Sequence, residues 1–315
     1  MKTLLETTDA VFGFCCDKIP GKGEDSWYYS VNEKCAVIGV FDGCGGLGAA
    51  RYDRMKDHTG AWLASRTASA CVNDWFTDSM EKPGFPDWDK LKEMMTEYLS
   101  SCLKMTGQAG TKLYGSMVRQ IPTTAAVWLV YQQGQNIIIT SVSAGDSRNY
   151  ILDTAGIGQI SRDDINGEDA FSNLYNDGVM TNVLAADGKF QFNIRTAVLQ
   201  QPSVLISATD GIFGYRKSPM EFEYWFLRAL MEASSIDQWT DAVKNETAKI
   251  AGDDYTFAAL SLGFGSFDEL KKRMRARYGE LSQMMREIGQ DPECRLRIWE
   301  SDKARYYRYA EGGVR

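Results

Sequence analysis

The sequence predicts an α+β protein, because segments typical of strands and of helices occur in separate blocks of the chain. Residues 35–41 form a short apolar run of strand length. The apolar runs 123–131 and 136–144 are separated by four residues that include a glycine, which is typical of a hairpin and hence of antiparallel pairing. Apolar residues recur at spacings of three and four in residues 61–75 and 270–288, as in amphipathic helices.

The remaining elements follow from the same criteria. Residues 162–195 are polar and rich in Gly, Asn and Asp, so they are expected to form a loop-like insertion. No internal repeat or low-complexity segment interrupts the pattern. In chain order the other expected elements are a strand that includes Cys15 and Cys16, a helix from about Trp88 to Met105, strands at 148–152, 203–208 and 255–262, and helices at about 220–233 and 236–250.

Composition indicates a globular protein with no membrane-spanning segment. Of the 315 residues, 44% are hydrophobic and 24% are charged, which argues against wholesale disorder. No apolar run approaches the ~20 residues that cross a bilayer. The start of the chain lacks the features of a signal peptide, because its apolar stretch is short and follows Glu6 and Asp9. We therefore expect a cytoplasmic protein.

The charge distribution divides the chain at residue 265. The net charge is −7, which argues against nucleic-acid binding. Residues 266–315 nevertheless carry a net charge of +3, and Ser266 with Glu269 forms a capping-box pattern at the start of a helix. We expect a main domain at 1–265 and a basic, mostly helical appendage at 266–315. The appendage either packs on the main domain through its apolar face, which we favour, or docks an acidic partner or nucleic acid.

Cysteine and histidine usage narrows the possible chemistry. The seven cysteines include no CxxC pair, so neither a disulfide framework nor a structural zinc site is indicated. His58 is the single histidine, which excludes metal sites with two histidines. Any metal must therefore be held by carboxylates, and carboxylates favour hard cations such as Mg²⁺ or Mn²⁺.

Acidic residues recur at the ends of the predicted strands. A carboxylate at the rim of a sheet is partly desolvated, and several together repel one another unless a cation neutralises them. Any one Asp-Gly pair alone is more typical of a turn, but the whole set favours a site for divalent cations. The acidic residues are Glu24, Asp25, Asp42, Asp146, Asp210, Asp253 and Asp254.

These acidic residues lie within a set of seven short segments: GKGEDSW, VIGVFDGCGG, PTTAAVWLV, SVSAGDSRNYIL, ISRDD, LISATDGIFGY and DDYTFAAL. In their order and spacing, these segments resemble the metal-dependent serine/threonine protein phosphatases of type 2C (the PPM family), in particular bacterial members. The resemblance covers about residues 10–264 and implies two stacked antiparallel β-sheets flanked by helices, a four-layer α-β-β-α sandwich.

The resemblance also implies an activity and a ligand set. Two Mn²⁺ or Mg²⁺ ions, or three, would activate a bridging hydroxide that attacks the phosphorus of phosphoserine or phosphothreonine, with no protein nucleophile. The substrate would be a phosphoprotein made by a partner kinase, and the insertion 162–195 would be the family's flap. The implied ligands are Asp42 as the bridge, the Gly43 carbonyl, Asp210 and Asp253 on one metal, Asp25 with Glu24 on the other side directly or through water, and Asp146 with Asp210 on a third metal.

Three positions depart from the family pattern. Cys44 replaces the histidine that animal and plant members have as proposed general acid, a change shared with many bacterial members. Pro20 replaces a phosphate-binding arginine, so Lys18 or Lys22 would have to bind phosphate without the bidentate fork of arginine. Pro122 replaces a glycine, a local loop difference.

Three other interpretations compete with the phosphatase. The first is a dinucleotide-binding fold, because residues 43–48 match its GxGxxG motif. Asp42 argues against it, since its carboxylate would repel the pyrophosphate of the dinucleotide. Cys44 lies one residue too far from Arg51 for the phosphate loop of a cysteine phosphatase. The strongest alternative is a catalytically weak or inactive phosphatase fold that binds a partner through residues 266–315. For Arg148 the alternatives are phosphate binding and a structural salt bridge at the metal rim, and we favour the salt bridge.

Overall fold

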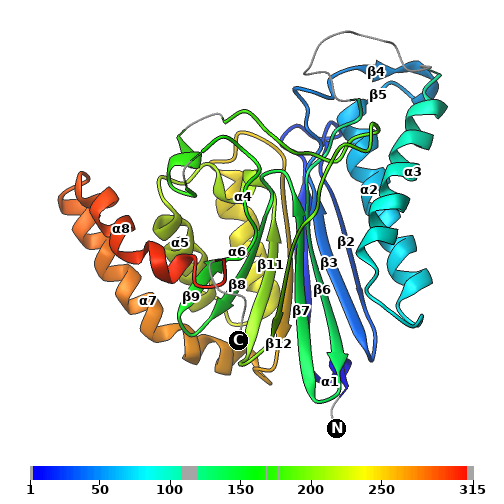
Figure 1. Ribbon diagram of the computed structural model, residues 1–315. Helices are drawn as coiled ribbons and strands as arrows, with labels where there is room; N and C mark the ends of the chain where they lie inside the picture. Colours follow the sequence, from blue (N-terminus) through cyan, green and yellow to red (C-terminus); the bar gives the residue numbers. More distant parts are fainter. Residues whose placement is uncertain (1–2, 108–119, 168, 176–177, 311–315) are drawn as a thin grey trace.

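Two five-stranded antiparallel sheets stack face to face in the computed structural model, which describes residues 3–107, 120–167, 169–175 and 178–310 (Figure 1). The first sheet has the order β1 (Thr8–Cys16), β12 (Tyr255–Leu262), β11 (Ser203–Ala208), β8 (Arg148–Asp153) and β9 (Gly156–Gln159). The second has the order β10 (Asn193–Val198), β7 (Asn136–Ala144), β6 (Ala125–Gln133), β3 (Cys35–Phe41) and β2 (Ser26–Val31). A small separate hairpin joins β4 (Arg51–Tyr52) to β5 (His58–Thr59).

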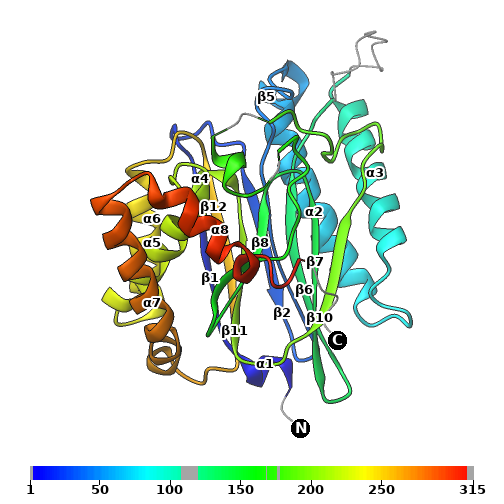
Figure 2. The same cartoon turned by 60° about the vertical axis from the view of Figure 1, so that its left-hand side comes forward.

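Helices cover the outer faces of both sheets, which confirms the predicted α+β sandwich. The second sheet is covered by α2 (Gly60–Ser79) and α3 (Trp88–Met105), and the first by α5 (Pro219–Glu232) and α6 (Ile236–Ala248). Beyond α5 lie α7 (Phe267–Gln290) and α8 (Cys294–Tyr306), as Figure 2 shows. The short helical segments are α1 (Leu4–Thr7), α4 (Asp210–Phe213), and the 3₁₀ turns η1 (Asp53–Met55) and η2 (Ser172–Leu174).

The layers follow from side-chain alternation along the strands. Strand β3 is buried along its whole length. Its residue Ile38 points between the two sheets, while Val37 points toward α2 and α3. On β11, Leu205 likewise faces the second sheet and Ile206 faces α5 and α6. A strand that is apolar on both faces reads as a continuous hydrophobic run, which is why its sequence predicted it.

The C-terminal helices share the hydrophobic core of the first sheet. Leu270 and Leu281 of α7 and Trp299 of α8 are fully buried in the same cluster as Phe226 of α5. At this scale of burial, each of these side chains contributes about 1.5–3 kcal/mol. The favoured interpretation, in which the appendage packs on the main domain, matches this arrangement.

The insertion at 162–195 is more structured than the sequence predicted. Strand β10 begins inside it and pairs along β7 at the edge of the second sheet. The prediction of a loop was wrong there because an edge strand with mostly half-exposed side chains carries no apolar run. Residues 168 and 176–177 of this insertion, and 311–315 of the appendage, lie outside the described residues. Among the described helices, none combines the length and apolarity needed to cross a membrane.

Candidate metal centre

Antiparallel pairing brings the acidic strand ends to one end of the sandwich. The register pairs Ser26 with Phe41 and Ala208 with Phe257. The ends of β3, β7 and β11 therefore lie beside the starts of β2, β8 and β12, away from α1 (Figure 1). All seven acidic residues identified in the sequence flank these strand ends.

Four of the predicted metal ligands line a single cavity of about 830 Å³ at this end: Asp42, Asp146, Asp210 and Asp253. A neighbouring cavity of about 390 Å³ shares Asp146 and Asp210. The backbone of Gly43 also lines the larger cavity, together with the glycine-rich turn that follows it. The sequence prediction thus identified residues that the fold does bring together.

The backbone of Asp42 is held by the paired threonines of the segment PTTA. Thr123 Oγ1 donates to the Asp42 carbonyl at 2.7 Å, and the Thr124 amide donates to the same oxygen at 2.8 Å. The Asp42 amide in turn donates to Thr124 Oγ1 at 3.2 Å. These bonds fix the peptide that carries the predicted bridging carboxylate. The segment PTTA was among those that resemble the phosphatase family, but the resemblance implied no role for its threonines.

Asp25 lies in the interior, where it connects the two sheets. Asp25 is only 3% exposed, and its Oδ2 atom accepts a hydrogen bond from Thr209 Oγ1 at 2.9 Å. Thr209 directly precedes Asp210, so Asp25 is tied to the loop of a second predicted ligand. Nothing in the sequence around Thr209 indicates that its hydroxyl binds Asp25.

A carboxylate given no individual role in the sequence analysis, that of Asp254, organises the loop before β2. It accepts hydrogen bonds from the backbone amides of Lys18 and Glu24, each at 2.7 Å. A Cβ atom at Gly211 would lie 1.9 Å from the Asp254 carbonyl oxygen, so only glycine permits the close approach of these two loops. Glu24 also accepts a hydrogen bond from the Thr59 hydroxyl.

Burial and mutual repulsion raise the pKa values of the clustered carboxyl groups. Burial, together with repulsion from Asp25 and Asp210, raises the pKa of Asp42 well above its usual range. Burial, with repulsion from Asp254 and Asp210, raises the pKa of Asp25 to about 8 against its lowering hydrogen bonds. Burial and the charge of Asp210 raise the pKa of Asp146 to about 7. Burial and the charge of Asp253 likewise raise the pKa of Asp210.

The donor set suits a hard divalent cation. Asp210 Oδ1 is buried and has no hydrogen-bond partner among the described residues. Within the described residues, no three Asp, Glu, His or Cys side chains already form a finished ligand group. The cavity fits a divalent cation for two reasons: its carboxylate and carbonyl oxygens are the ligands that such a cation prefers, and the cation would neutralise the excess negative charge.

This electrostatic arrangement predicts a pH-dependent stabilisation by Mn²⁺. A carboxyl whose pKa is raised on folding stabilises the fold fully below about pH 4, and that contribution is lost as the pH rises through about 7–8. Mn²⁺ competes with these protons. We expect Mn²⁺ to raise the melting temperature more at about pH 8 than at about pH 5.5, measured against EDTA. Equal shifts at both pH values would contradict the protonated state of this cluster.

Cys44 lines the cavity but is a poor nucleophile. Burial and the charge of Asp42 raise the pKa of its thiol well above the usual range. Its Sγ atom lies 4.0 Å from both the Asp42 carbonyl oxygen and Met180 Sδ. A catalytic cysteine needs a lowered pKa, so this environment argues against the cysteine phosphatase.

The two lysines predicted to bind phosphate lie away from the acidic cavity. Lys18 Nζ donates to the Ala251 carbonyl, and Lys22 lines a separate cavity beside Glu24. Neither is among the residues that line the larger acidic cavity. His58, in the same separate cavity as Lys22, stacks on Trp62 with the ring centroids 3.5 Å apart.

Arg148 forms the structural salt bridge that the sequence suggested. Its guanidinium pairs with Asp163 through bonds of 2.6–3.1 Å, and both side chains are buried. The same guanidinium lies 4.1 Å from the ring centroid of Phe213. Arg148 also lines the smaller cavity, where it faces Asp146 and Asp210. It therefore places a neutralised cation beside the acidic cluster.

The insertion forms a wall of the larger cavity. Gly178, Val179, Met180, Thr181 and Val183 line it. The segment is held by Asp164, whose carbonyl accepts from the Thr181 amide at 2.7 Å and whose carboxylate accepts from the Asn182 side chain at 2.6 Å.

Comparison with known proteins identifies the architecture. No protein-family model and no curated protein sequence matches the chain. Solved structures do match: the phosphatase Stp1 of Staphylococcus aureus (TM-score 0.60, 16% identity, 83% of this chain and 97% of that one) and PstP/Ppp of Mycobacterium tuberculosis (0.55, 16%, 80% and 97%). The PPM phosphatase MsPP of Mycobacterium smegmatis, solved with cacodylate, gives 0.56, 12%, 82% and 100%.

The chain has the fold of the bacterial PPM-type serine/threonine phosphatases. At 12–17% identity this likeness concerns the fold alone. The PstP catalytic domain, also similar (TM-score 0.50), was solved with two manganese ions. In this PPM fold, the cavity lined by four aspartates is the candidate metal centre of the chain.

Proposed function

We propose that this protein hydrolyses phosphoserine and phosphothreonine esters in proteins with the help of two or three Mn²⁺ or Mg²⁺ ions. The observation that carries the proposal is the meeting of Asp42, Asp146, Asp210 and Asp253 in one cavity of a PPM phosphatase fold. A phosphoprotein substrate implies a serine/threonine kinase as the enzyme that produces it.

The ions would be held by oxygen ligands from the strand ends. Asp42 and the Gly43 carbonyl, with Asp210 and Asp253, would bind on one side, and Asp25 with Glu24 on the other, directly or through water. Asp146 with Asp210 would hold a third ion. When bound there, divalent cations supply an acidified water as nucleophile and offset the charge of the phosphoryl group.

The protein's own residues would position and shield the reacting groups. Thr123 and Thr124 hold the peptide of Asp42, and the salt bridge to Asp163 holds Arg148 beside Asp146. Val179 and Met180 of the insertion give the cavity an apolar wall that excludes part of the solvent. Neither His58 nor Cys44 serves as general acid in this proposal, because His58 does not line the acidic cavity and the raised pKa of the Cys44 thiol makes it a weak acid. The leaving hydroxyl would take its proton from water.

Hydrolysis of p-nitrophenyl phosphate and of a phosphothreonine peptide tests the proposal, with Mn²⁺, with Mg²⁺ and with EDTA. Turnover of both substrates that requires a divalent cation is the expected result. Folded protein that neither turns over substrate nor binds Mn²⁺ in calorimetry would contradict the proposal. That result would favour the alternative function, a phosphatase-fold binding module that acts through its C-terminal helices.

A further inference from the structure

The segment 169–175 forms a second wall beside the acidic cluster. Asn173 and Leu174 line the smaller cavity, opposite Asp146 and Asp210. Asn173 Nδ2 donates to Asp163 Oδ2 at 2.9 Å, which joins this wall to the partner of Arg148. We call residues 169–175 the side wall. A phosphopeptide bound at the proposed centre would have to pass along one of the two walls.

Helix α8 holds the side wall at its first two residues. Asp169 Oδ2 accepts hydrogen bonds from Trp299 Nε1 at 3.0 Å and from Lys303 Nζ at 2.7 Å. The Ala170 amide donates to Tyr307 Oη at 2.6 Å. Asp169 Oδ1 meanwhile accepts the amides at 171 and 172, at 3.0 and 2.9 Å, so one carboxylate links the helix to the turn of the wall.

A second connection runs from α8 to the rim of the acidic cluster. Tyr306 Oη donates to Gln159 Oε1 at 3.0 Å, and Gln159 Nε2 donates to Asp163 Oδ1 at 2.8 Å. Asp163 is the partner of Arg148. Every group in this connection is buried, and a buried, satisfied polar network is costly to distort.

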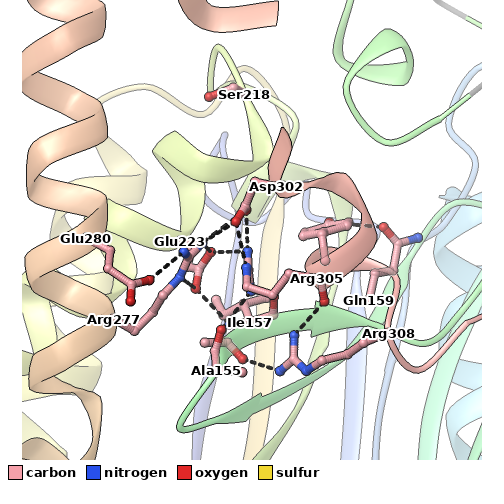
Figure 3. A network of polar contacts seen from close by, with 12 residues as sticks. Ala155, Ile157, Gln159, Ser218, Glu223, Arg277, Glu280, Asp302, Arg305 and Arg308 are labelled. Atoms are coloured by element: carbon pink, nitrogen blue, oxygen red, sulfur yellow. Dashed lines mark hydrogen bonds and ion pairs between the residues drawn. The ribbon is translucent and has the colours of Figure 1, made fainter. Parts of the chain in front are cut away.

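Helix α8 is itself fixed by a buried network of ion pairs, shown in Figure 3. Glu223 of α5 accepts hydrogen bonds from Arg277 of α7 at 2.8 and 2.9 Å and from Arg305 of α8 at 2.7 Å. Asp302 pairs with the same two arginines. Arg305 also donates to the Ile157 carbonyl at 2.7 Å. Three helices and the β8–β9 hairpin are therefore held in one register.

We propose that α8 is a positioning element for substrate: through Lys303 and its C-cap residue Tyr307 it sets the side wall along which the phosphopeptide binds. This inference rests on the proposed phosphatase function and assigns a role to the C-terminal helices within it. The contacts join a helix outside the sandwich to Asp169 and Ala170, the start of the side wall, whose Asn173 and Leu174 line the smaller cavity. Lys303 and Tyr307 are positioning residues, because neither lines the acidic cavities.

The test uses the full chain with the double substitution Lys303→Met and Tyr307→Phe. Hydrogen exchange in the presence of EDTA should become at least about tenfold faster at the amides of residues 170–172, the factor that corresponds to one lost charge-assisted hydrogen bond. The KM for a phosphothreonine peptide should rise at least about fivefold, while kcat and the KM for p-nitrophenyl phosphate stay within about twofold. With Lys303→Arg in place of Lys303→Met, the KM for the phosphothreonine peptide should return most of the way to the wild-type value.

A matched control replaces an exposed lysine and an exposed tyrosine, Lys272→Met with Tyr29→Phe, and should leave all these quantities unchanged. Unchanged exchange at 170–172 in the test variant would overturn the proposal. So would faster exchange with an unchanged peptide KM, or an equal loss of activity on both substrates. A wild-type protein without any turnover would count against the phosphatase function alone, because the exchange experiment requires no catalysis.

Discussion

Replacing Asp210 by asparagine is expected to lower metal-dependent turnover by at least roughly 10²–10³-fold, the effect typical of losing one strong electrostatic contact in an active site. Asp210 is half-buried just after β11, lines both acidic cavities and has one buried carboxylate oxygen with no hydrogen-bond partner among the described residues. The substitution keeps the shape of the side chain but removes one negative charge from the cluster. The measurement is kcat/KM for p-nitrophenyl phosphate at saturating Mn²⁺, with Mn²⁺ affinity from calorimetry.

The matched control is Asp241→Asn, which makes the same chemical change on the exposed surface of α6. It should leave both turnover and Mn²⁺ binding unchanged. Removing charge from a crowded acidic cluster is also expected to stabilise the metal-free protein, because repulsion from Asp253 and Asp42 is relieved. An Asp210→Asn protein that binds Mn²⁺ and turns over substrate as the wild type does would remove Asp210 from the proposed centre.

Replacing Glu223 by alanine is expected to lower the free energy of unfolding by about 3–5 kcal/mol. Glu223 is fully buried and neutralises Arg277 and Arg305, whose side chains are 3% and 19% exposed. Without it, two largely buried cations keep only Asp302 as a shared partner and the Ile157 amide loses its acceptor. Urea denaturation of the two proteins measures the difference.

The matched control on the same helix is Glu232→Ala, whose carboxylate is 71% exposed and lies 3.9 Å from Arg228. Solvent screens such a pair, so only a small change is expected there. A third variant, Glu223→Leu with Arg277→Leu, removes a cation and an anion together and should cost less than Glu223→Ala. If Glu223→Ala and Glu232→Ala lower stability equally, the network in Figure 3 contributes nothing specific.

The local pattern of the sequence was enough to predict most of the strands and helices. The run CAVIGVF lies between two apolar layers, and a strand buried on both faces must be apolar throughout. The helix at 267–290 repeats its buried residues at helical spacing and begins at the Ser266 cap. Strand β10 escaped because only Ala197 in it is buried, so its strand state depends on pairing with β7 rather than on its own residues.

The sequence alone was also enough to predict four acids that line the candidate centre. Asp42 and Asp210 follow β3 and β11, and Asp146 lies between β7 and β8. Antiparallel pairing places these strand ends at the same end of the sandwich. Which polar groups pair with one another became visible only in the folded structure. Thr209 meets Asp25 across 184 residues, and Glu223 meets Arg277 across 54. Such pairings leave no local pattern in the sequence. The two partners are far apart in the chain and become neighbours only when the protein folds.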